Sequence, residues 1–328
     1  MQKRIRETDI LQTARRVLEV SMGVKPAESI LIVTDTATSP LIAQSFFDAA
    51  STIGCEVMLM EMLPRARSGI EPPKAIAEAM KNVDVVIMPT SKSLSHTKAR
   101  VKCGCGGARM TTMPGITEEM MVSGGMTADY QKVSKFVLDS RTLLSSAKEI
   151  RITADPGTDI VFDVQGCKWK ADTGLCLAPG CCINLPAGEV YVAPRNAEGK
   201  IVVDGTISEL GLLKSPVEIT VENRFISDIK GERADELKSI LEGAGKLAYN
   251  VAELGFGLNP VARMIGNALE DEKVGGTIHI GLGDSSTIGG DVVAGIHLDA
   301  IVTKPKIFAD GKEVKPGGFD KKSNRNML

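Results

Sequence analysis

The chain has 328 residues, a formal net charge of −2 and a sequence pI of about 6.0. This length allows two domains of ordinary size, each with its own core. The nearly balanced charge argues against nucleic-acid binding, and no apolar run reaches the length of a membrane span. The charged N-terminus predicts an amphipathic helix and not a signal peptide, so we expect a cytoplasmic protein whose seven cysteines are thiols.

The first part of the chain alternates between predicted helices and strands. Apolar periodicity predicts helices at 8–22, 40–53 (with Ser39 as N-cap), 72–82 and 95–107. Apolar runs predict strands at 30–35, 55–62, 84–90 and 108–115. This alternation predicts a doubly wound, mostly parallel α/β sheet over residues 1–147. The glycine-rich loop of a dinucleotide-binding domain is missing after the first strand, so we expect no such cofactor.

From residue 148 the pattern changes to short strands separated by Gly, Asp and Pro, which indicates antiparallel sheet. The predicted strands are 149–155, 158–166, 188–194, 200–207, 217–226, 277–283, 296–302 and 306–311, and the predicted helices are 234–251 and 261–270. We therefore predict a C-terminal β-rich α+β metal-binding domain over 148–328.

Histidines are few, and two of the three lie close together in the sequence. His279 and His297 fall in the glycine-rich stretch 273–299, and Asp299 follows His297 by two positions. In a strand, residues two apart point to the same face, so an imidazole and a carboxylate would project together. Such a pair suits a divalent metal ion, although two structural histidines would give the same pattern. The third histidine, His96, follows a predicted strand of the first domain, where it would either contact substrate or be structural.

Two glutamates are further candidate ligands. Glu189 enters a predicted strand directly after a Pro-Ala-Gly turn, and Glu253 lies between a predicted helix end and a glycine-rich turn. Side chains at the edges of rigid elements can reach a cleft. The alternative is that both glutamates are ordinary surface residues.

These residues belong to four ordered motifs: N-x-P-x-G-E-V-x-x-A-P (184–194), A-E-x-G-F-G-x-N (252–259), T-I-H-x-G-x-G (277–283) and H-x-D (297–299). Together with SHTKAR (95–100) and MPGITEEM (113–120), the set resembles the thermophilic metallo-aminopeptidases of the aminopeptidase T and aminopeptidase S type. The resemblance implies two divalent metal ions, zinc or cobalt, held by Glu189, Glu253, His279, His297 and Asp299. Charge counting agrees, because three carboxylates and a bridging hydroxide balance two dications.

The resemblance implies a metal-dependent aminopeptidase-like hydrolase that removes N-terminal residues from small peptides, or cleaves another amide, through a metal-bound hydroxide. Glu253 would accept the proton of the attacking water. A homodimer is also implied. The catalytic tyrosine of that family is replaced here by Ser286, a candidate substrate contact, and the two motif histidines are only 18 positions apart.

Two alternatives remain open. Ring-opening dioxygenases that act on dihydroxypyridines resemble the same fold and keep a histidine–histidine–aspartate set. In that case His279, His297 and Asp299 would form a facial triad for a single non-haem Fe(II). The absence of the tyrosine agrees with this alternative. The other alternative is a metal-binding homologue without peptidase activity.

Overall fold

The computed structural model describes residues 5–95 and 97–318, and the chain divides into two compact units. The first unit runs to Gln131 and includes Gly174–Ala187, while the second comprises Lys132–Thr173 and the chain from Gly188 onwards. This division differs from the single boundary expected near residue 147. The reason is strand β8 (Cys182–Asn184), which returns to the first unit and pairs in parallel with β4 (Arg109–Thr112).

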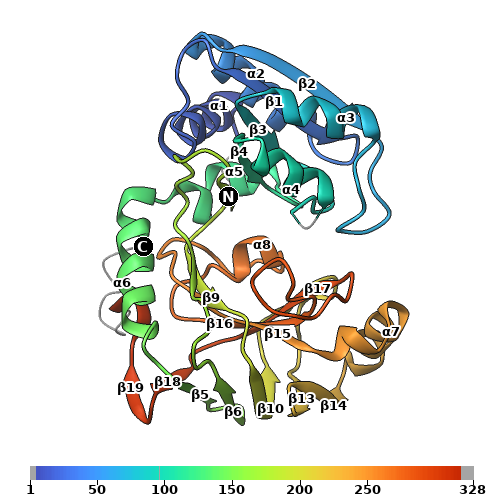
Figure 1. The fold of residues 1–328 in the computed structure, drawn as a ribbon, viewed down its shortest axis with the longest axis vertical. Coiled ribbons are helices and arrows are strands. Elements are labelled where there is room, and N and C mark those ends of the chain that lie inside the picture. Colours follow the sequence, from blue (N-terminus) through green and yellow to red (C-terminus); the bar gives the residue numbers. More distant parts are fainter. Residues whose placement is uncertain (1–4, 96, 319–328) are drawn as a thin grey trace. The chain divides into compact units, whose positions relative to one another are not determined.

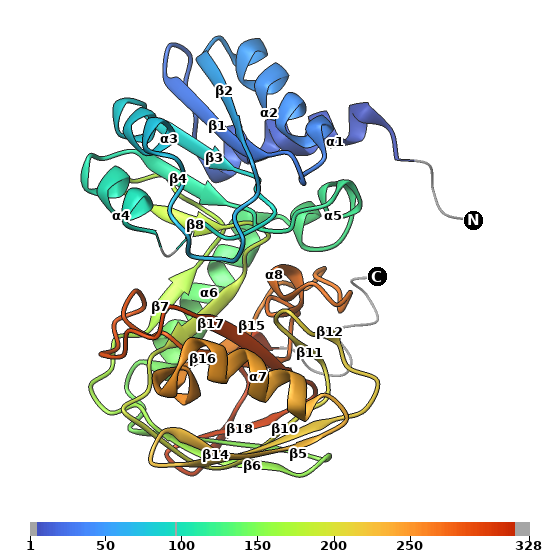
Figure 2. The same ribbon diagram turned by 90° about the vertical axis from the view of Figure 1, so that its right-hand side faces the viewer.

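The first unit contains the predicted doubly wound parallel sheet, with strand order β2-β1-β3-β4-β8. Its remaining strands are β1 (Ser29–Asp35), β2 (Glu56–Met62) and β3 (Val85–Met88). Its helices are α1 (Glu7–Arg16, continued by a π-helical turn Val17–Ser21), α2 (Pro40–Ile53), α3 (Lys74–Ala79), α4 (Lys98–Cys105) and α5 (Glu118–Val122), with short 3-10 turns at Met80–Asn82 and Gly124–Thr127. Figure 2 shows α1 and α2 on one face of the sheet and α3 and α4 on the other. The expected fold of this part is confirmed.

Helix α2 shows which local predictions succeed. It begins with Pro40 in its first turn and ends at Gly54, whose φ of 94° favours glycine. Ser39 does not cap the helix, however. Its hydroxyl donates to Glu118 Oε1 at 2.5 Å instead, so a tertiary contact replaces the local one.

The second unit is β-rich, as expected. Within the described residues it contains two antiparallel seven-stranded sheets, with orders β14-β13-β10-β6-β5-β18-β19 and β12-β11-β17-β16-β15-β9-β7. The first of these sheets is formed by β5 (Glu149–Ala154), β6 (Thr158–Asp163), β10 (Asn196–Val203), β13 (Val217–Glu222), β14 (Phe225–Gly231), β18 (Lys306–Ala309) and β19 (Lys312–Val314). The other is formed by β7 (Lys170–Asp172), β9 (Glu189–Val192), β11 (Thr206–Ile207), β12 (Gly211–Leu212), β15 (Val251–Gly257), β16 (Ile278–Gly283) and β17 (His297–Val302).

The two sheets form two layers of the second unit, with β15–β17 above β5, β6 and β10 in the orientation of Figure 1. Its helices are α6 (Tyr130–Leu144, which starts just before the unit boundary), α7 (Ala234–Ala244) and α8 (Ala268–Asp271), with 3-10 turns at Lys246–Tyr249 and Pro316–Gly318. In the described part of the chain, no helix is long and apolar enough to cross a membrane.

Three predicted elements of the second unit are wrong in detail. The segment 217–226 is not one strand but a hairpin, because Asn223 and Arg224 adopt positive φ and turn the chain between β13 and β14. The predicted helix 234–251 ends early, and β15 begins at Val251. The predicted helix 261–270 is reduced to α8, with Asn267 as its N-cap.

One pair of cysteines also departs from expectation. Cys176 and Cys181 are joined in a disulfide, whereas we expected all seven cysteines to be thiols. The intervening turn, in which the Cys181 N–H donates to the Ala178 carbonyl, brings the two Cα atoms to 5.4 Å. The other five cysteines are thiols.

Candidate metal centre

The five predicted ligands share one face of the sheet that contains β9, β15, β16 and β17. Residues directly opposite each other in antiparallel strands point to the same face. In this register Gly281 lies opposite both Glu253 and Asp299, and Gly255 lies opposite His279. His297 precedes Asp299 by two residues, so both side chains point to this face. Glu189 lies opposite Gly257, which is two residues from Gly255, so Glu189 points to the same face as well. The other face is apolar and buried, so the sheet separates core from site.

Two glycines make room for the imidazole rings. A Cβ atom at Gly255 would lie 1.9 Å from His279 Nε2. A Cβ atom at Gly281 would lie 2.7 Å from both His297 Nε2 and the Glu253 Cβ. The rings therefore lie flat against the sheet in spaces that a larger residue would fill.

The ligand atoms form a continuous series across this face. His279 Nε2 lies 3.3 Å from Glu189 Oε2 and 3.3 Å from Glu253 Oε1. On the other side, His297 Nε2 lies 3.4 Å from Glu253 Oε2 and 3.3 Å from Asp299 Oδ1. The two histidines thus approach the two oxygens of the same carboxylate, Glu253. The structure brings together all five residues that the sequence singled out.

These separations fit the edges of a metal coordination shell better than hydrogen bonds. Charge-assisted N–H···O bonds are typically about 2.7–2.9 Å long, whereas ligand atoms about 2.1 Å from one ion are about 3.0–3.4 Å apart. Within the part of the chain that the structure describes, the buried Oε2 atom of Glu189 accepts no hydrogen bond, and the ligand atoms of Glu189, Glu253 and His279 lie within 4.8 Å of one another. Such a group could hold a divalent ion. The donor set of carboxylate oxygens and imidazole nitrogens suits Fe(II), Mn(II) or Zn(II).

The charges within the cluster strongly perturb its acid–base behaviour. Burial acts to raise the pKa of Glu253, but hydrogen bonds and positive charge from His279 and His297 outweigh it and lower that pKa to about 2. Conversely, burial acts to lower the pKa of His279, and the Glu253 hydrogen bond with the Glu189 and Glu253 charges raises it to about 9. Burial also acts to lower the pKa of His297, but the charge and hydrogen bond of Asp299, together with Glu253, hold it well above its usual value. Without a metal ion, protons therefore take the place of the missing positive charge.

Sequence reasoning missed two members of the cluster. Lys273 is fully buried; its Nζ atom lies 2.6 Å from Glu189 Oε1 and also contacts Glu272 Oε1. Burial raises the pKa of the Glu272 carboxyl, as do the charges of Asp299 and Glu189, although Lys273 opposes this. Adjacent acidic and basic residues are common on surfaces, so the sequence held no sign that this pair was buried.

His297 is oriented from outside the cluster. Its Nδ1 atom lies 2.8 Å from the backbone carbonyl oxygen of Asp284, which leaves Nε2 to face Glu253 and Asp299. The Asp284 carboxylate accepts hydrogen bonds from the backbone N–H groups of Ser286, Ala294 and Gly295 and from the Ser286 hydroxyl. Asp284 thereby organises the short segment between the two histidines.

Several predictions about individual residues require correction. Glu253 does not lie at a turn but within strand β15, and both it and Glu189 are buried, so neither is a surface glutamate. Ser286 is exposed, with its hydroxyl bonded to Asp284 at 2.6 Å. Tyr191 lies opposite Gly255 on the face that carries the cluster. Burial and the charges of Glu253 and Glu189 raise its pKa. His96 lies outside the described residues.

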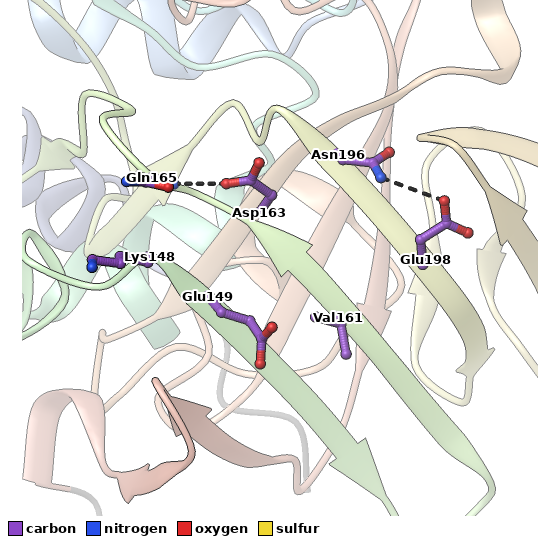
Figure 3. A pocket seen from close by; sticks show the side chains of 7 residues that line it. All are labelled: Lys148, Glu149, Val161, Asp163, Gln165, Asn196 and Glu198. Atoms are coloured by element: carbon purple, nitrogen blue, oxygen red, sulfur yellow. Dashed lines mark hydrogen bonds between the residues drawn. The ribbon is translucent and has the colours of Figure 1, made fainter.

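A separate hollow of about 290 Å³ lies on β5, β6 and β10 (Figure 3). It is lined by Lys148, Glu149, Val161, Asp163, Gln165, Asn196 and Glu198. Some of these polar groups bond to each other, since Gln165 N–H donates to Asp163 Oδ1 and the Asn196 amide to Glu198 Oε1. None of the cluster residues lines this hollow.

A doubly wound parallel sheet and a β-rich unit with a buried cluster of carboxylates and imidazoles define a class of α/β protein with a candidate metal centre. Within that class, the chain belongs to the family described as NicX: 2,5-dihydroxypyridine 5,6-dioxygenase, whose sequence model matches residues 9–318. It is therefore a member of an enzyme family.

Two solved structures share the fold. The 2,5-dihydroxypyridine dioxygenase from Pseudomonas putida KT2440 is similar with a TM-score of 0.82 and 19% identity, over 98% of this chain and 99% of that one. Wild-type AmpT from Thermus thermophilus is similar with a TM-score of 0.68 and 14% identity, over 94% of this chain and 97% of that one. At these identities the likeness shows the fold alone. Comparison with curated protein sequences gives no match.

The family assignment corrects the leading functional expectation. The resemblance to aminopeptidase T holds for the fold, but the prediction of a metallo-aminopeptidase-like hydrolase is wrong, because the matching family is one of dioxygenases. The motifs that suggested the peptidase belong to a fold that both solved structures share, and a shared fold does not determine the chemistry. The family implies the use of a metal ion, whereas the expected pair of zinc or cobalt ions is not shown.

Proposed function

We propose that this chain is a non-haem iron dioxygenase that opens the ring of a dihydroxylated pyridine. Both oxygen atoms of O₂ enter the product, across the C5–C6 bond in the case of 2,5-dihydroxypyridine, so the reaction needs no further reductant. The observation that carries this proposal is the approach of His279 Nε2 and His297 Nε2 to one carboxylate, with Asp299 beside His297, in a chain of this family.

His279, His297 and Asp299 would hold the iron, because two imidazoles and one carboxylate form the ligand set that non-haem Fe(II) oxygenases use. A bound ferrous ion supplies the redox centre at which O₂ and an electron-rich ring react. The backbone carbonyl of Asp284 keeps the His297 ring in the orientation that presents Nε2 to the site. The neighbouring glycines, Gly255 and Gly281, keep the sheet surface open under both rings.

Glu253 has a separate task in this proposal. Its carboxylate lies between the two imidazoles, with Oε1 3.3 Å from His279 Nε2 and Oε2 3.4 Å from His297 Nε2. A phenol-like ring hydroxyl must lose a proton to become electron-rich enough for oxidation. Glu253 would accept that proton as general base, a role typically worth about 10²–10⁴ in rate. This keeps the proton-accepting role first assigned to Glu253 but moves it from a water molecule to the substrate.

The test is oxygen consumption by protein loaded with Fe(II) under anaerobic conditions. With 2,5-dihydroxypyridine we expect one O₂ consumed per ring opened, and loss of the ring absorbance at the same rate. His279→Ala and Asp299→Ala should abolish turnover, whereas Gly243→Ala on the exposed side of α7 should retain it. Pyridines with a single hydroxyl group should react poorly.

Absence of O₂ uptake across a panel of dihydroxylated pyridines, with iron content verified, would overturn the proposal. A second contrary result would be O₂ uptake that survives in Asp299→Ala, because the proposed ligand set would then be dispensable.

A further inference from the structure

A fully buried lysine lies at one end of the ionisable cluster. Lysine is almost never completely buried unless it is paired, and Lys273 is 0% exposed. Its ammonium group contacts two carboxylates, at 2.6 Å from Glu189 Oε1 and in direct contact with Glu272 Oε1. The lysine is therefore built into the site as a fixed positive charge.

The five metal-type side chains form two groups of three donors that share Glu253. One group is Glu189 Oε2, His279 Nε2 and Glu253 Oε1, and the other is Glu253 Oε2, His297 Nε2 and Asp299 Oδ1. Successive donors in both groups are 3.3–3.4 Å apart. Considered without Lys273, this arrangement would accommodate two divalent ions bridged by one carboxylate.

We propose that Lys273 is a positioning residue that occupies the place of a second metal ion, so that its contact with Glu189 limits the cluster to a single divalent ion. This inference rests on the metal-binding part of the proposed function and concerns how many ions the site takes.

Two features of the contacts support it. Lys273 binds the Oε1 atom of the carboxylate whose Oε2 atom faces His279, so a dication held by Oε2 would lie beside an ammonium group on the same carboxylate. Like charges this close repel strongly in a buried site. The ammonium also neutralises part of the negative charge that would otherwise attract the second ion.

The experiment uses Mn(II) as a redox-stable probe of the full-length, metal-free protein. Metal content is measured by elemental analysis after equilibrium dialysis, and electron paramagnetic resonance distinguishes an isolated Mn(II) ion from an exchange-coupled pair. For the wild-type protein we expect one ion per chain and the spectrum of an isolated ion. For Lys273→Met we expect a second ion, which doubles the metal content and produces the coupled spectrum.

Two further variants separate this role from a merely structural one. Glu272→Gln keeps the lysine on Glu189, so its metal content should remain at one ion. The double variant Lys273→Met/Glu272→Gln removes the lysine together with one of the buried charges it neutralises, and it should take up the second ion even if Lys273→Met alone fails to fold.

Two ions bound to the wild-type protein would overturn the inference. This measurement needs no variant, so the inference can be contradicted even if neither lysine variant folds. Folded lysine variants that still bind one ion would also overturn it. No Mn(II) binding at all would remove the basis of both this inference and the proposed function. Two ions in an enzyme that still opens dihydroxypyridines would contradict the lysine's role alone, while one ion without O₂ uptake would contradict the proposed function alone.

Discussion

Gly255 lies directly opposite His279 in the β15–β16 pair, and the histidine ring occupies the space that a side chain at 255 would need. A Cβ atom there would be 1.9 Å from His279 Nε2, the atom that faces both Glu189 and Glu253. The position of the imidazole therefore depends on the absence of a side chain on the neighbouring strand. This dependence is important because no group among the described residues hydrogen-bonds to the Nδ1 atom of His279 and orients the ring.

Gly255→Ala should consequently weaken metal binding. The added methyl group must push the His279 ring away from the carboxylates, and disturbing the support of a metal ligand typically costs about 10–100-fold in affinity. We expect a loss of at least this size in Mn(II) affinity, measured by isothermal titration calorimetry.

Gly243→Ala is the matched control. No atom lies within 4 Å of a Cβ at Gly243, which is an exposed position near the end of α7, so alanine should leave metal affinity unchanged and stabilise the helix by about 0.5–1 kcal/mol. Unchanged affinity in Gly255→Ala would show that His279 does not bind the ion from its present position.

The histidine-rich part of the site could be predicted from the sequence because it depends on local geometry. The two-residue spacing of His297 and Asp299 places them on one face of any strand, and β17 is such a strand. The prediction that Glu253 lies beside a turn is wrong. The strand that contains it, Val251–Gly257, has two glycines among its seven residues and follows a predicted helix, and both features are typical of a turn. Gly255 is required by the His279 ring packed against the sheet, and Gly257 by the close backbone carbonyl of Val274, and no local propensity expresses such tertiary contacts.

The first unit was predictable for a similar reason. Its buried strands β1 and β3 are continuous apolar runs that alternate with helices, so the parallel sheet could be predicted from the sequence. The pairing of β8 with β4 could not be foreseen, since it joins segments some 70 residues apart through a strand of only three residues, Cys182–Asn184. Lys273 was missed because burial of a charged pair is a property of the folded cluster.

The affinity of the cluster for metal should increase with pH. The pKa of His279 is raised to about 9 in the metal-free protein, so its Nε2 carries a proton at neutral pH. A divalent ion needs the neutral imidazole and must displace that proton. Below about pH 9 displacement of the His279 proton should make the apparent affinity rise about tenfold per pH unit, and this contribution should level off above that value.

Mn(II) titrations at several pH values up to about 9 measure how steeply the apparent affinity rises with pH. His279→Gln should make this rise less steep, because one displaceable proton is removed. An affinity that does not change with pH would contradict the raised pKa of His279.

The orientation of His297 should depend on Asp284 although that residue is outside the cluster. Asp284→Ala removes the carboxylate that accepts from the backbone N–H groups of Ser286, Ala294 and Gly295, and this frees the segment whose carbonyl oxygen holds His297 Nδ1. We expect about 10–100-fold weaker metal binding, as for other residues that orient ligands. Ser286→Ala removes only one of the accepted bonds and should have a much smaller effect. Equal effects of the two variants would indicate that the segment is held by other contacts.

The central position of β15 can be tested through its apolar face. Phe256 is 1% exposed, lies opposite Ile278 and Val190, and has its ring centroid 5.9 Å from that of Trp169. If 251–257 is a buried strand, Phe256→Ala should lower the free energy of unfolding by about 3–5 kcal/mol, the usual cost of truncating a buried phenylalanine. If the segment were an exposed turn, as its glycines suggested, the change would be small.

Val293→Ala, at a side chain that is 68% exposed, provides the control and should change stability by less than about 0.5 kcal/mol. Urea denaturation of the metal-free protein measures both. Because Phe256 and the metal ligands occupy opposite faces of the same sheet, a Phe256→Ala protein that remains folded should still bind metal, which separates the stability of the strand from the chemistry it supports.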